Sequence, residues 1–287
     1  MSQPPVWLIT GTSNGFGAAI AQVVLQRGHR VIATARNPSK IISLQSAGAT
    51  ALSLDVTWPL EKIKETIAEA HKIHGRIDIL VNAAGYILEG AVEETSPEET
   101  YAQFNTNVFG TMNVTRAVLP YMRKQRSGVI ANFGSLGSWR GGPAFANYAA
   151  TKWAVSGVTE SLQPELEPFG IEATVIEPGY FRSNFLNEDA RVRSQARIQD
   201  YEETVAGQLR KVLDATANKQ LGNVAKGAEV IVDVLTKTGV AEGRAIPVRL
   251  VLGSDCQEAI RGKMKETEEL LDQWKEVSYS TDYPEGE

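Results

Sequence analysis

The chain has 287 residues, of which 43% are apolar and 22% are charged. This length and composition suit one large domain with a sizeable core, and they argue against disorder of the whole chain. Lysine plus arginine number 29 and aspartate plus glutamate number 34, a net charge of −5, which argues against a nucleic-acid-binding surface and favours a small-molecule ligand.

Short β-branched runs alternate along the chain with longer segments of helical periodicity. The predicted strands are residues 6–10, 31–35, 51–54, 77–81, 129–133, 171–176 and about 248–251. The predicted helices follow Gly17 and cover residues 60–74, 100–125, 147–167, 224–237 and 258–274. Strands separated by helices of this length need crossover connections, so we expect a Rossmann-type α/β fold, a doubly wound parallel sheet in three α/β/α layers.

The alternation lapses between about residues 183 and 223, which are polar, charged and helical in pattern without an obvious strand. We interpret this stretch as an insertion that covers the substrate pocket of a single domain spanning residues 1–275. Residues 276–287, with Pro284, Gly286 and several acidic side chains, are expected to form a frayed acidic tail.

Cys256 is the single cysteine, so the sequence excludes an internal disulfide and a cysteine-rich metal site. The three histidines, His29, His71 and His74, do not have the spacing of a metal site, and no metal is expected. The first residues lack the basic region of a signal peptide, and no apolar run approaches the roughly 20 residues that span a bilayer. We therefore expect a cytoplasmic protein without a transmembrane segment.

A glycine-rich turn, Thr10–Gly17, joins the first predicted strand to the first helix, with the spacing G-x-x-x-G-x-G. Glycines allow a tight turn there and bring backbone N–H groups to the helix N-terminus, where an anionic pyrophosphate binds well. The alternative is an ordinary strand-to-helix turn. The preceding strand favours a nucleotide-binding turn.

Arg36 ends the second predicted strand, 19 residues after Gly17, where a dinucleotide-binding fold reads the adenosine ribose. An acidic residue at this position would bind the ribose 2′-hydroxyl, whereas a guanidinium pairs with a 2′-phosphate. The sequence therefore predicts NADP(H) in preference to NAD(H). The alternative is an arginine that follows a strand into solvent.

Two further segments, Asp55-Val56 and Asn82–Gly85, follow the third and fourth predicted strands. Ligands of open α/β sheets bind at the carboxyl ends of the strands, so both are candidate ligand contacts. Turn chemistry alone also explains asparagine and glycine at such places.

The segment Tyr148–Lys152 places a tyrosine and a lysine four residues apart, on one face of a predicted helix, with Ser135 thirteen residues earlier. A nearby ammonium group lowers the pKa of a phenol and makes it a usable acid or base, and a serine hydroxyl can polarise a carbonyl oxygen. The pair alone is also common on surface helices.

Taken together, these motifs closely resemble the short-chain dehydrogenases/reductases in order and spacing, over about residues 5–185 and more loosely to 255. The motifs that carry the resemblance are Thr10–Gly17, Asn82–Gly85, Asn107–Gly110, Ser135, Tyr148–Lys152 and Pro178-Gly179. Within that family, residues 31–38 and 107–110 look most like the branch of the 17β-hydroxysteroid and retinol dehydrogenases.

The resemblance implies a catalytic tetrad. Tyr148 would be the acid/base, Ser135 would stabilise the substrate oxygen, and Lys152 would lower the phenol pKa and bind the nicotinamide ribose. Asn107 would hold a water in a proton relay to Lys152.

The resemblance also implies a set of cofactor contacts in addition to Tyr148 and Lys152. They are Gly11, Ser13, Asn14, Gly15, Phe16 and Gly17 at the pyrophosphate, Arg36 at the 2′-phosphate, Asp55 and Val56 at the adenine, Asn82, Ala83 and Gly85 near the riboses, and Pro178, Gly179, Phe181 and Ser183 at the nicotinamide.

The function implied is an NADP(H)-dependent oxidoreductase that reduces a ketone or aldehyde, or oxidises a secondary alcohol, of an apolar small molecule. The alternative is an NADP(H)-binding scaffold of this family that serves regulation or a non-redox transformation. By resemblance, two long helices around residues 107–125 and 147–167 would pair in a homodimer or homotetramer.

The sequence departs from the family pattern at three positions. Gly134 replaces a usual serine, Ala83 replaces the second asparagine of N-N-A-G, and Ser183 stands where threonine is common. We expect Gly134 to enlarge or loosen the substrate side, and Ser183 to keep a hydroxyl for the carboxamide of the cofactor.

Overall fold

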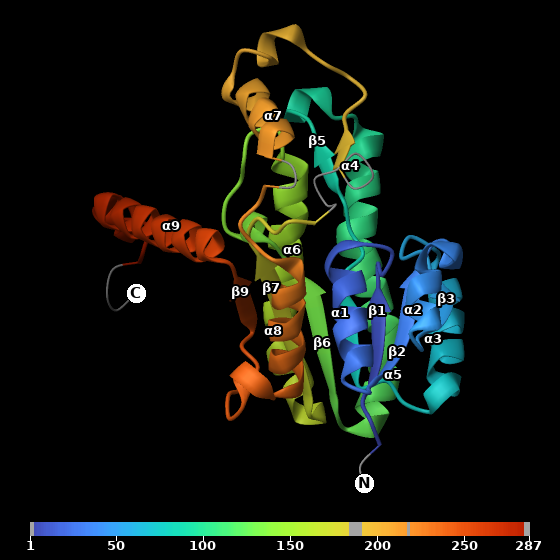
Figure 1. Cartoon of the computed structure of the whole chain (residues 1–287). Coiled ribbons are helices and arrows are strands. Elements are labelled where there is room, and N and C mark those ends of the chain that lie inside the picture. Colours follow the sequence, from blue (N-terminus) through green and yellow to red (C-terminus); the bar gives the residue numbers. More distant parts are fainter. Residues whose placement is uncertain (1–2, 184–190, 217–218, 284–287) are drawn as a thin grey trace.

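A computed structural model describes residues 3–183, 191–216 and 219–283 and has a central sheet between two layers of helices (Figure 1). The sheet has seven parallel strands in the order β3-β2-β1-β4-β6-β7-β9. These strands are β1 (Val6–Thr10), β2 (Arg30–Ala35), β3 (Thr50–Ser53), β4 (Ile79–Asn82), β6 (Gly128–Phe133), β7 (Ile171–Pro178) and β9 (Arg249–Leu252). The expected doubly wound α/β/α fold is confirmed.

The two faces of the sheet carry separate apolar cores, and β1 contributes to both. Its side chains alternate between the faces, as in any strand. Trp7 and Ile9 pack with the helices α1 (Gly15–Gln26) and α8 (Val224–Thr236), while Val6 and Leu8 lie in the opposite core. All five residues of β1 are buried, as expected for a central parallel strand.

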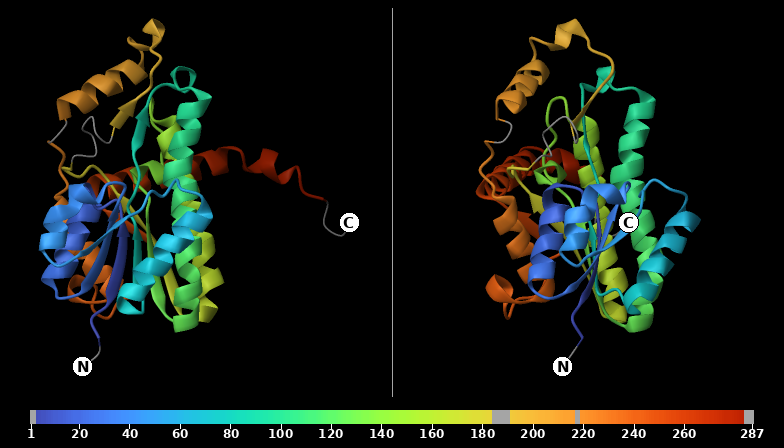
Figure 2. Two further views of the ribbon diagram at one scale, coloured as in Figure 1. Left: turned by 90° about the vertical axis from the view of Figure 1, so that its right-hand side faces the viewer. Right: turned by 45° about the vertical axis from the view of Figure 1, so that its right-hand side comes forward.

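The opposite face is covered by three long helices, α3 (Leu60–His74), α5 (Thr111–Gln125) and α6 (Ala146–Leu166) (Figures 1 and 2). A short helix, α2 (Ile42–Ser46), lies between β2 and β3. Further helical turns are η1 (Pro38–Ile41), η2 (Val92–Glu94), η4 (Leu136–Ser138), η5 (Glu167–Phe169), η7 (Gln199–Tyr201) and η8 (Gly239–Ala241).

Strand order reverses between β1 and β4, because β1 continues to β2 on one side while the chain returns to β4 on the other. Side by side at the carboxyl end lie Thr10 of β1, Asn82 of β4 and Asn132 of β6. A crevice forms at such a switch point, and it is where open α/β sheets bind ligands.

The single helix predicted over residues 100–125 is two helices joined by a π-helical turn. They are α4 (Pro97–Phe104), η3 (Asn105–Gly110) and α5. Ser96 and Glu99 form a capping box that starts α4 earlier than periodicity indicated. A π-helical turn widens the helix by one residue per turn and often marks a functional site.

The prediction that residues 183–223 contain no strand was wrong. Strand β8 (Arg191–Arg193) pairs in parallel with β5 (Ile87–Glu89), and the helix α7 (Val205–Thr216) follows. Three-residue strands are too short to show an alternating pattern. Residues 184–190 of this stretch lie outside the described residues.

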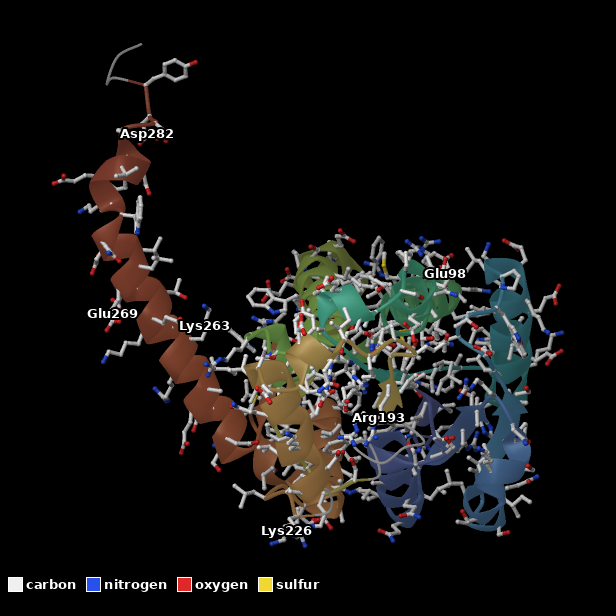
Figure 3. All side chains as sticks on the ribbon, turned by 90° about the horizontal axis from the view of Figure 1, so that it is seen from above. Glu98, Arg193, Lys226, Lys263, Glu269 and Asp282 are labelled. Carbon is white, nitrogen blue, oxygen red and sulfur yellow. The ribbon has the colours of Figure 1, made fainter. Side chains whose placement is uncertain are left out.

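The C-terminal helix α9 (Ser254–Gln273) begins four residues before the predicted start and projects away from the body (Figures 2 and 3). The short helix α10 (Lys275–Tyr279) occupies the first part of the expected frayed tail, whose last residues, 284–287, lie outside the described residues. No helix in the described ranges is long and apolar enough to cross a membrane.

Candidate active site

A cavity of about 1220 Å³ opens at the carboxyl ends of the strands, between the sheet and the segment that carries β8 and α7. It collects most of the residues predicted from sequence. These are Gly11, Ser13, Asn14, Gly15, Phe16, Gly17, Arg36, Asp55, Val56, Ala83, Gly85, Ser135, Tyr148, Lys152, Pro178, Gly179, Phe181 and Ser183. Asn82 and Asn107 do not line it.

The glycine-rich turn fits a pyrophosphate. Gly11 has a φ of +68°, and a Cβ there would lie 2.8 Å from the backbone of Ala84. A Cβ on Gly17 would collide with the carbonyl oxygen of Gly11. Within the described residues, the Asn14 side chain makes no capping hydrogen bond, so the first N–H groups of α1 are left for an anion.

Arg36 and Asp55 lie just beyond the carboxyl ends of the neighbouring strands β2 and β3. Arg36 is exposed and lines the cavity, and its carbonyl oxygen accepts a hydrogen bond of 3.3 Å from Ser53. The Asp55 carboxylate accepts hydrogen bonds from the backbone and the side chain of Thr57, which fixes the turn after β3. Gly110 allows the close approach of Val56, because a Cβ at Gly110 would lie 2.7 Å from the Val56 side chain.

Asn82 lies beneath the cavity rather than in its wall. Its amide donates to Asn132 at 2.8 Å and to Thr115 at 3.1 Å, and the Asn132 amide donates to Thr159 at 3.0 Å. This buried chain of polar side chains ties β4 and β6 to α5 and α6. The predicted contact of Asn82 with a ribose stays a prediction.

Thr10 is a structural contributor that sequence reasoning missed. Its hydroxyl accepts hydrogen bonds of 3.1 Å from the N–H groups of both Ala83 and Ala84. It thereby shapes the turn that faces the glycine-rich segment. A hydroxyl at the end of a buried strand was the available signal in the sequence.

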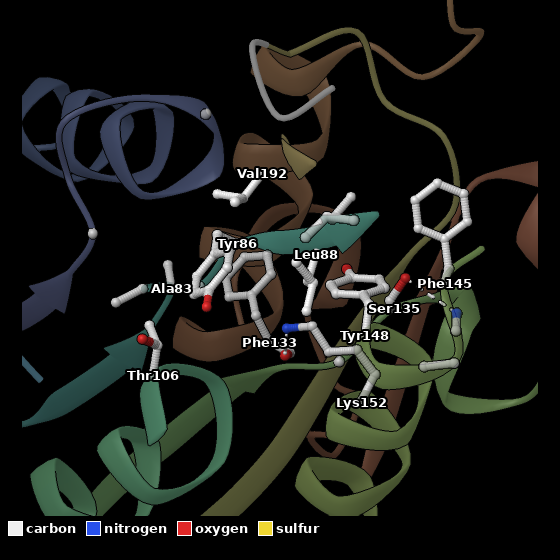
Figure 4. A pocket seen from close by; sticks show the side chains of 18 of the residues that line it. Ala83, Tyr86, Leu88, Thr106, Phe133, Ser135, Phe145, Tyr148, Lys152 and Val192 are labelled. Carbon is white, nitrogen blue, oxygen red and sulfur yellow. Dashed lines mark hydrogen bonds between the residues drawn. The ribbon is translucent and has the colours of Figure 1, made fainter. Parts of the chain in front are cut away.

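Ser135, Tyr148 and Lys152 meet at one wall of the cavity (Figure 4). The Tyr148 phenol is hydrogen-bonded to the Ser135 side chain. The spacing of four residues on α6 sets Lys152 next to Tyr148, with its Nζ 5.5 Å from the ring centre. The same Nζ donates a hydrogen bond of 2.7 Å to the Phe133 carbonyl oxygen, which holds the ammonium group at the end of β6.

Burial dominates the ionisation of this pair. It raises the pKa of Tyr148 to about 12, although the hydrogen bond with Ser135 pulls the other way. It lowers the pKa of Lys152 to about 8. In the protein alone the loss of solvation therefore dominates the pKa of Tyr148, and the expected lowering of that pKa by Lys152 stays a prediction.

Asn107 lies in the π-helical turn and joins two elements behind the site. Its amide nitrogen donates to the Tyr86 carbonyl at 3.0 Å and to the Thr151 hydroxyl at 3.1 Å, while its amide oxygen accepts from the Tyr86 N–H at 3.1 Å. These bonds tie the segment after β4 to α6, next to Lys152. The water relay that the resemblance implies stays a prediction.

The wall opposite the sheet is apolar and comes largely from α7. Leu209 and Leu213 pack with Ile87, Phe145 and the ring of Tyr148. Leu88 and Val192 extend this wall along β5 and β8 (Figure 4). Residues of the expected insertion therefore line the cavity, and its role as a cover of the substrate pocket stays a prediction.

An ion-pair network holds the insertion on the body. Arg210 of α7 pairs with Glu94, whose exposed fraction is 1%. Burial alone would raise the pKa of Glu94, but hydrogen bonds from Ala91, Ile198 and Arg210 hold it below its usual value. Arg191 of β8 pairs with Glu89 and with Asp214.

Gly134 has a different role from the expected one. A Cβ there would meet the Val175 side chain at 2.8 Å, the Ser138 Oγ at 2.9 Å and the Glu177 Cγ at 3.0 Å. Gly134 itself lines the cavity, but the space that its missing side chain leaves lies behind it, toward these three groups, rather than on the substrate side. Among the aromatic residues near the site, Phe145, Tyr180 and Phe181 line the cavity, whereas Trp139 packs behind it.

Comparison with known proteins identifies the family. The short chain dehydrogenase family matches residues 5–194. The oxidoreductase BOA17 of Botryotinia fuckeliana is 34% identical over 96% of this chain and 98% of its own length. A 3-ketodihydrosphingosine reductase of Bacteroides thetaiotaomicron is 38% identical over 72% of this chain and 76% of its own.

Solved structures agree with the sequence matches. A short-chain dehydrogenase from Streptomyces avermitilis superposes with a TM-score of 0.88 and 38% identity, covering 98% of this chain and all of that one. ElxO, solved with NADP bound, superposes over 89% of this chain with a TM-score of 0.69 and 25% identity. The fold, the matched residues and the relatives establish that this chain belongs to the short-chain dehydrogenase family of oxidoreductases.

Proposed function

We propose that this protein uses NADP(H) to reduce a ketone or aldehyde, or to oxidise a secondary alcohol, of an apolar small molecule. Its catalytic residues are Ser135, Tyr148, Lys152 and Asn107. The observation that carries the proposal is the Tyr148 phenol, hydrogen-bonded to Ser135 and close to Lys152, in the same cavity as the glycine-rich turn.

The cofactor assignment rests on the turn and on Arg36. The N–H groups at Gly15, Phe16 and Gly17 would hold the pyrophosphate at the start of α1. The exposed Arg36 guanidinium at the edge of the cavity suits a 2′-phosphate. The similarity to ElxO, solved with NADP bound, is consistent with a nicotinamide cofactor.

In the reducing direction, the nicotinamide would supply the hydride. The Ser135 hydroxyl orients the carbonyl oxygen of the substrate, and Tyr148 donates a proton to that oxygen. A phenol with a pKa of about 12 stays protonated at neutral pH, which suits a proton donor. Below a pH of about 8, Lys152 carries a positive charge that stabilises the phenolate left behind.

The substrate class follows from the apolar wall. Leu209, Leu213, Ile87 and Phe145 surround the catalytic phenol on the side away from the sheet. Burying apolar surface there stabilises a bound apolar substrate by roughly 25 cal/mol per Å². A 3-ketodihydrosphingosine reductase among the relatives is consistent with an apolar ketone.

The test combines binding and turnover in the purified protein. NADPH and NADH are titrated by fluorescence, and nicotinamide absorbance is then followed with a panel of apolar ketones and aldehydes. Tyr148→Phe should lower turnover by about 10² to 10⁴-fold and leave NADPH affinity largely intact, because it removes only the hydroxyl group that donates the proton. Unchanged turnover in this variant would refute the assignment. Tight NADPH binding without turnover of any compound would favour the alternative, a nucleotide-binding scaffold used for regulation.

Self-association is a further part of the proposal. Trp153 on α6 and Phe109 of η3, which precedes α5, are 50% and 43% exposed, and the family resemblance implies that α5 and α6 pair between subunits. Exposed aromatic side chains of this size favour an interface. Light scattering of the purified protein should give a dimer or tetramer, and Trp153→Glu should shift it toward the monomer.

A further inference from the structure

A buried carboxylate lies behind the catalytic centre, at the end of β7. Glu177 has an exposed fraction of 0% and directly precedes Pro178 of the cavity wall. Its oxygens accept hydrogen bonds from the Trp139 indole at 2.8 Å and the Ser156 hydroxyl at 2.9 Å, and Arg249 pairs with it at 2.9 Å. A fully buried charge is maintained only when it is partnered in this way.

Ser138 connects this carboxylate to the catalytic residues. Its side chain lies against Glu177 and works against the rise in the pKa of that carboxyl that burial causes. Its Oγ also accepts a hydrogen bond of 3.2 Å from the Ser135 N–H and donates one of 3.0 Å to the Lys152 carbonyl oxygen. A single buried hydroxyl therefore contacts the backbone of both Ser135 and Lys152.

The space for this arrangement depends on Gly134. A Cβ at that position would lie 2.9 Å from the Ser138 Oγ and 3.0 Å from the Glu177 Cγ. Both contacts are closer than side-chain carbons normally allow, so a larger residue would displace Ser138 or Glu177. The glycine at position 134, where the family usually has a serine, therefore leaves the space that the Ser138 and Glu177 side chains need.

We propose that Ser138 and Glu177 are positioning residues, which fix Ser135 and Lys152 in the geometry needed for proton transfer. Trp139, Ser156 and Arg249 fix the position of Glu177. Ser138 packs against Glu177 and in turn fixes the Ser135 N–H and the Lys152 carbonyl. This inference rests on the proposed function, because it assigns Ser135 and Lys152 to the reaction.

The effect is expected in the chemical step. A displacement of about 1 Å in a reacting group can lower a rate about 10²-fold. Neither Ser138 nor Glu177 lines the cavity, so their removal leaves the pyrophosphate turn and Arg36 in place. The predicted signature is therefore a lower kcat with a much smaller change in NADPH affinity.

Ser156 offers a matched control. Like Ser138, it is a buried serine beside Glu177, to which its hydroxyl donates a hydrogen bond of 2.9 Å, but among the described residues it makes no hydrogen bond to Ser135 or Lys152. Ser138→Ala should lower kcat by about tenfold to a hundredfold. Ser156→Ala leaves Glu177 held by Trp139 and Arg249, so it should lose a comparable amount of thermal stability and keep the wild-type kcat. Glu177→Gln should lower kcat in the same way as Ser138→Ala.

These outcomes separate positioning from stability. Equal kcat values in the wild type and Ser138→Ala, or equal losses of kcat in Ser138→Ala and Ser156→Ala, would overturn the proposal. Each variant is also compared by thermal unfolding and by its Kd for NADPH, so that a folding defect is recognised.

A second readout does not need turnover. In protein labelled with carbon-13 at the lysine ε position, NMR follows the titration of Lys152. Ser138→Ala should shift this titration, whereas Ser156→Ala should leave it unchanged. If the wild type reduces no compound but the shift appears, the proposed function fails and the positioning role stands. If the Lys152 titration is the same in all three proteins, the positioning role fails.

Discussion

The Nζ of Lys152 lies 5.5 Å from the centre of the Tyr148 ring, and burial shifts the pKa of each group toward its neutral form. With a pKa of about 12, Tyr148 stays protonated through the neutral range. With a pKa of about 8, Lys152 loses its charge within the range of ordinary assays. In the proposed mechanism, the lysine is therefore the group whose titration controls the reducing reaction.

Reductive activity should accordingly fall as the pH rises through about 8. Lys152 is protonated below this pH and stabilises the phenolate that forms, whereas above it the charge is lost. The measurement is the pH profile of kcat/KM for NADPH, which reports ionisations of the free enzyme. Lys152→Arg, whose charge persists at high pH, should remove the decline from whatever activity remains. A wild-type profile that is flat or rising between pH 8 and 9.5 would contradict the prediction.

Arg36→Ala should weaken NADPH binding by about 10 to 100-fold and leave NADH binding nearly unchanged. The loss corresponds to about 1.5 to 3 kcal/mol, the usual value of a hydrogen bond to a charged group. Lys40→Ala is the matched control, since Lys40 is an exposed cation four residues away that does not line the cavity. Equal losses of NADPH affinity in the two variants would show that the positive charge of this region, and not a direct contact of Arg36 with the 2′-phosphate, determines the affinity.

Arg210→Met should lower the free energy of unfolding by about 3 to 5 kcal/mol, because it removes the guanidinium nearest to the buried Glu94 carboxylate and leaves that of Arg197, 3.7 Å away. Arg193→Met, which removes a half-exposed pair with Asp214, should cost less than about 1 kcal/mol. Urea unfolding of both variants gives the comparison. Since α7 covers the apolar wall, Arg210→Met should also raise KM for the carbonyl substrate. Equal stabilities of the two variants would show that the network does not hold the insertion.

Gly17→Ala should abolish tight cofactor binding, because its Cβ would collide with the carbonyl oxygen of Gly11 and push the turn away from α1. Gly157→Ala is a control in the middle of α6, where a Cβ would meet no described atom within 4 Å. It should stabilise the fold by about 0.5 to 1 kcal/mol and leave NADPH affinity unchanged. Fluorescence titration with NADPH distinguishes the two, and wild-type affinity in Gly17→Ala would rule out the pyrophosphate cradle.

The local patterns of the sequence were sufficient for the sheet and for most of the cavity wall. Strand and helix periodicities depend on neighbouring residues, so the seven parallel strands and the helices α3, α6 and α8 lie within a few residues of their predicted bounds. The spacing of Tyr148 and Lys152 on one helical face likewise needs no tertiary information.

Contacts between distant segments could not be predicted in this way. Strands β5 and β8 are three residues each and exist because they pair with each other. Arg210 and Glu94 are 116 residues apart, and neither residue's neighbours in the chain indicate the other. The side-chain partners of Asn82 and Asn107, which turn both away from the cavity, depend on α5 and α6 in the same manner.

By itself, the sequence determined the fold class, the family and the identity of the catalytic and cofactor-binding candidates, because these depend on short motifs and on the repeat of apolar side chains. Only the tertiary structure decided the direction of the Tyr148 pKa shift, the closure of the site by α7 and the buried link from Glu177 through Ser138 to the catalytic centre. The physical reason is that desolvation and buried hydrogen bonds depend on which distant segments exclude water from a group, and no local pattern records that.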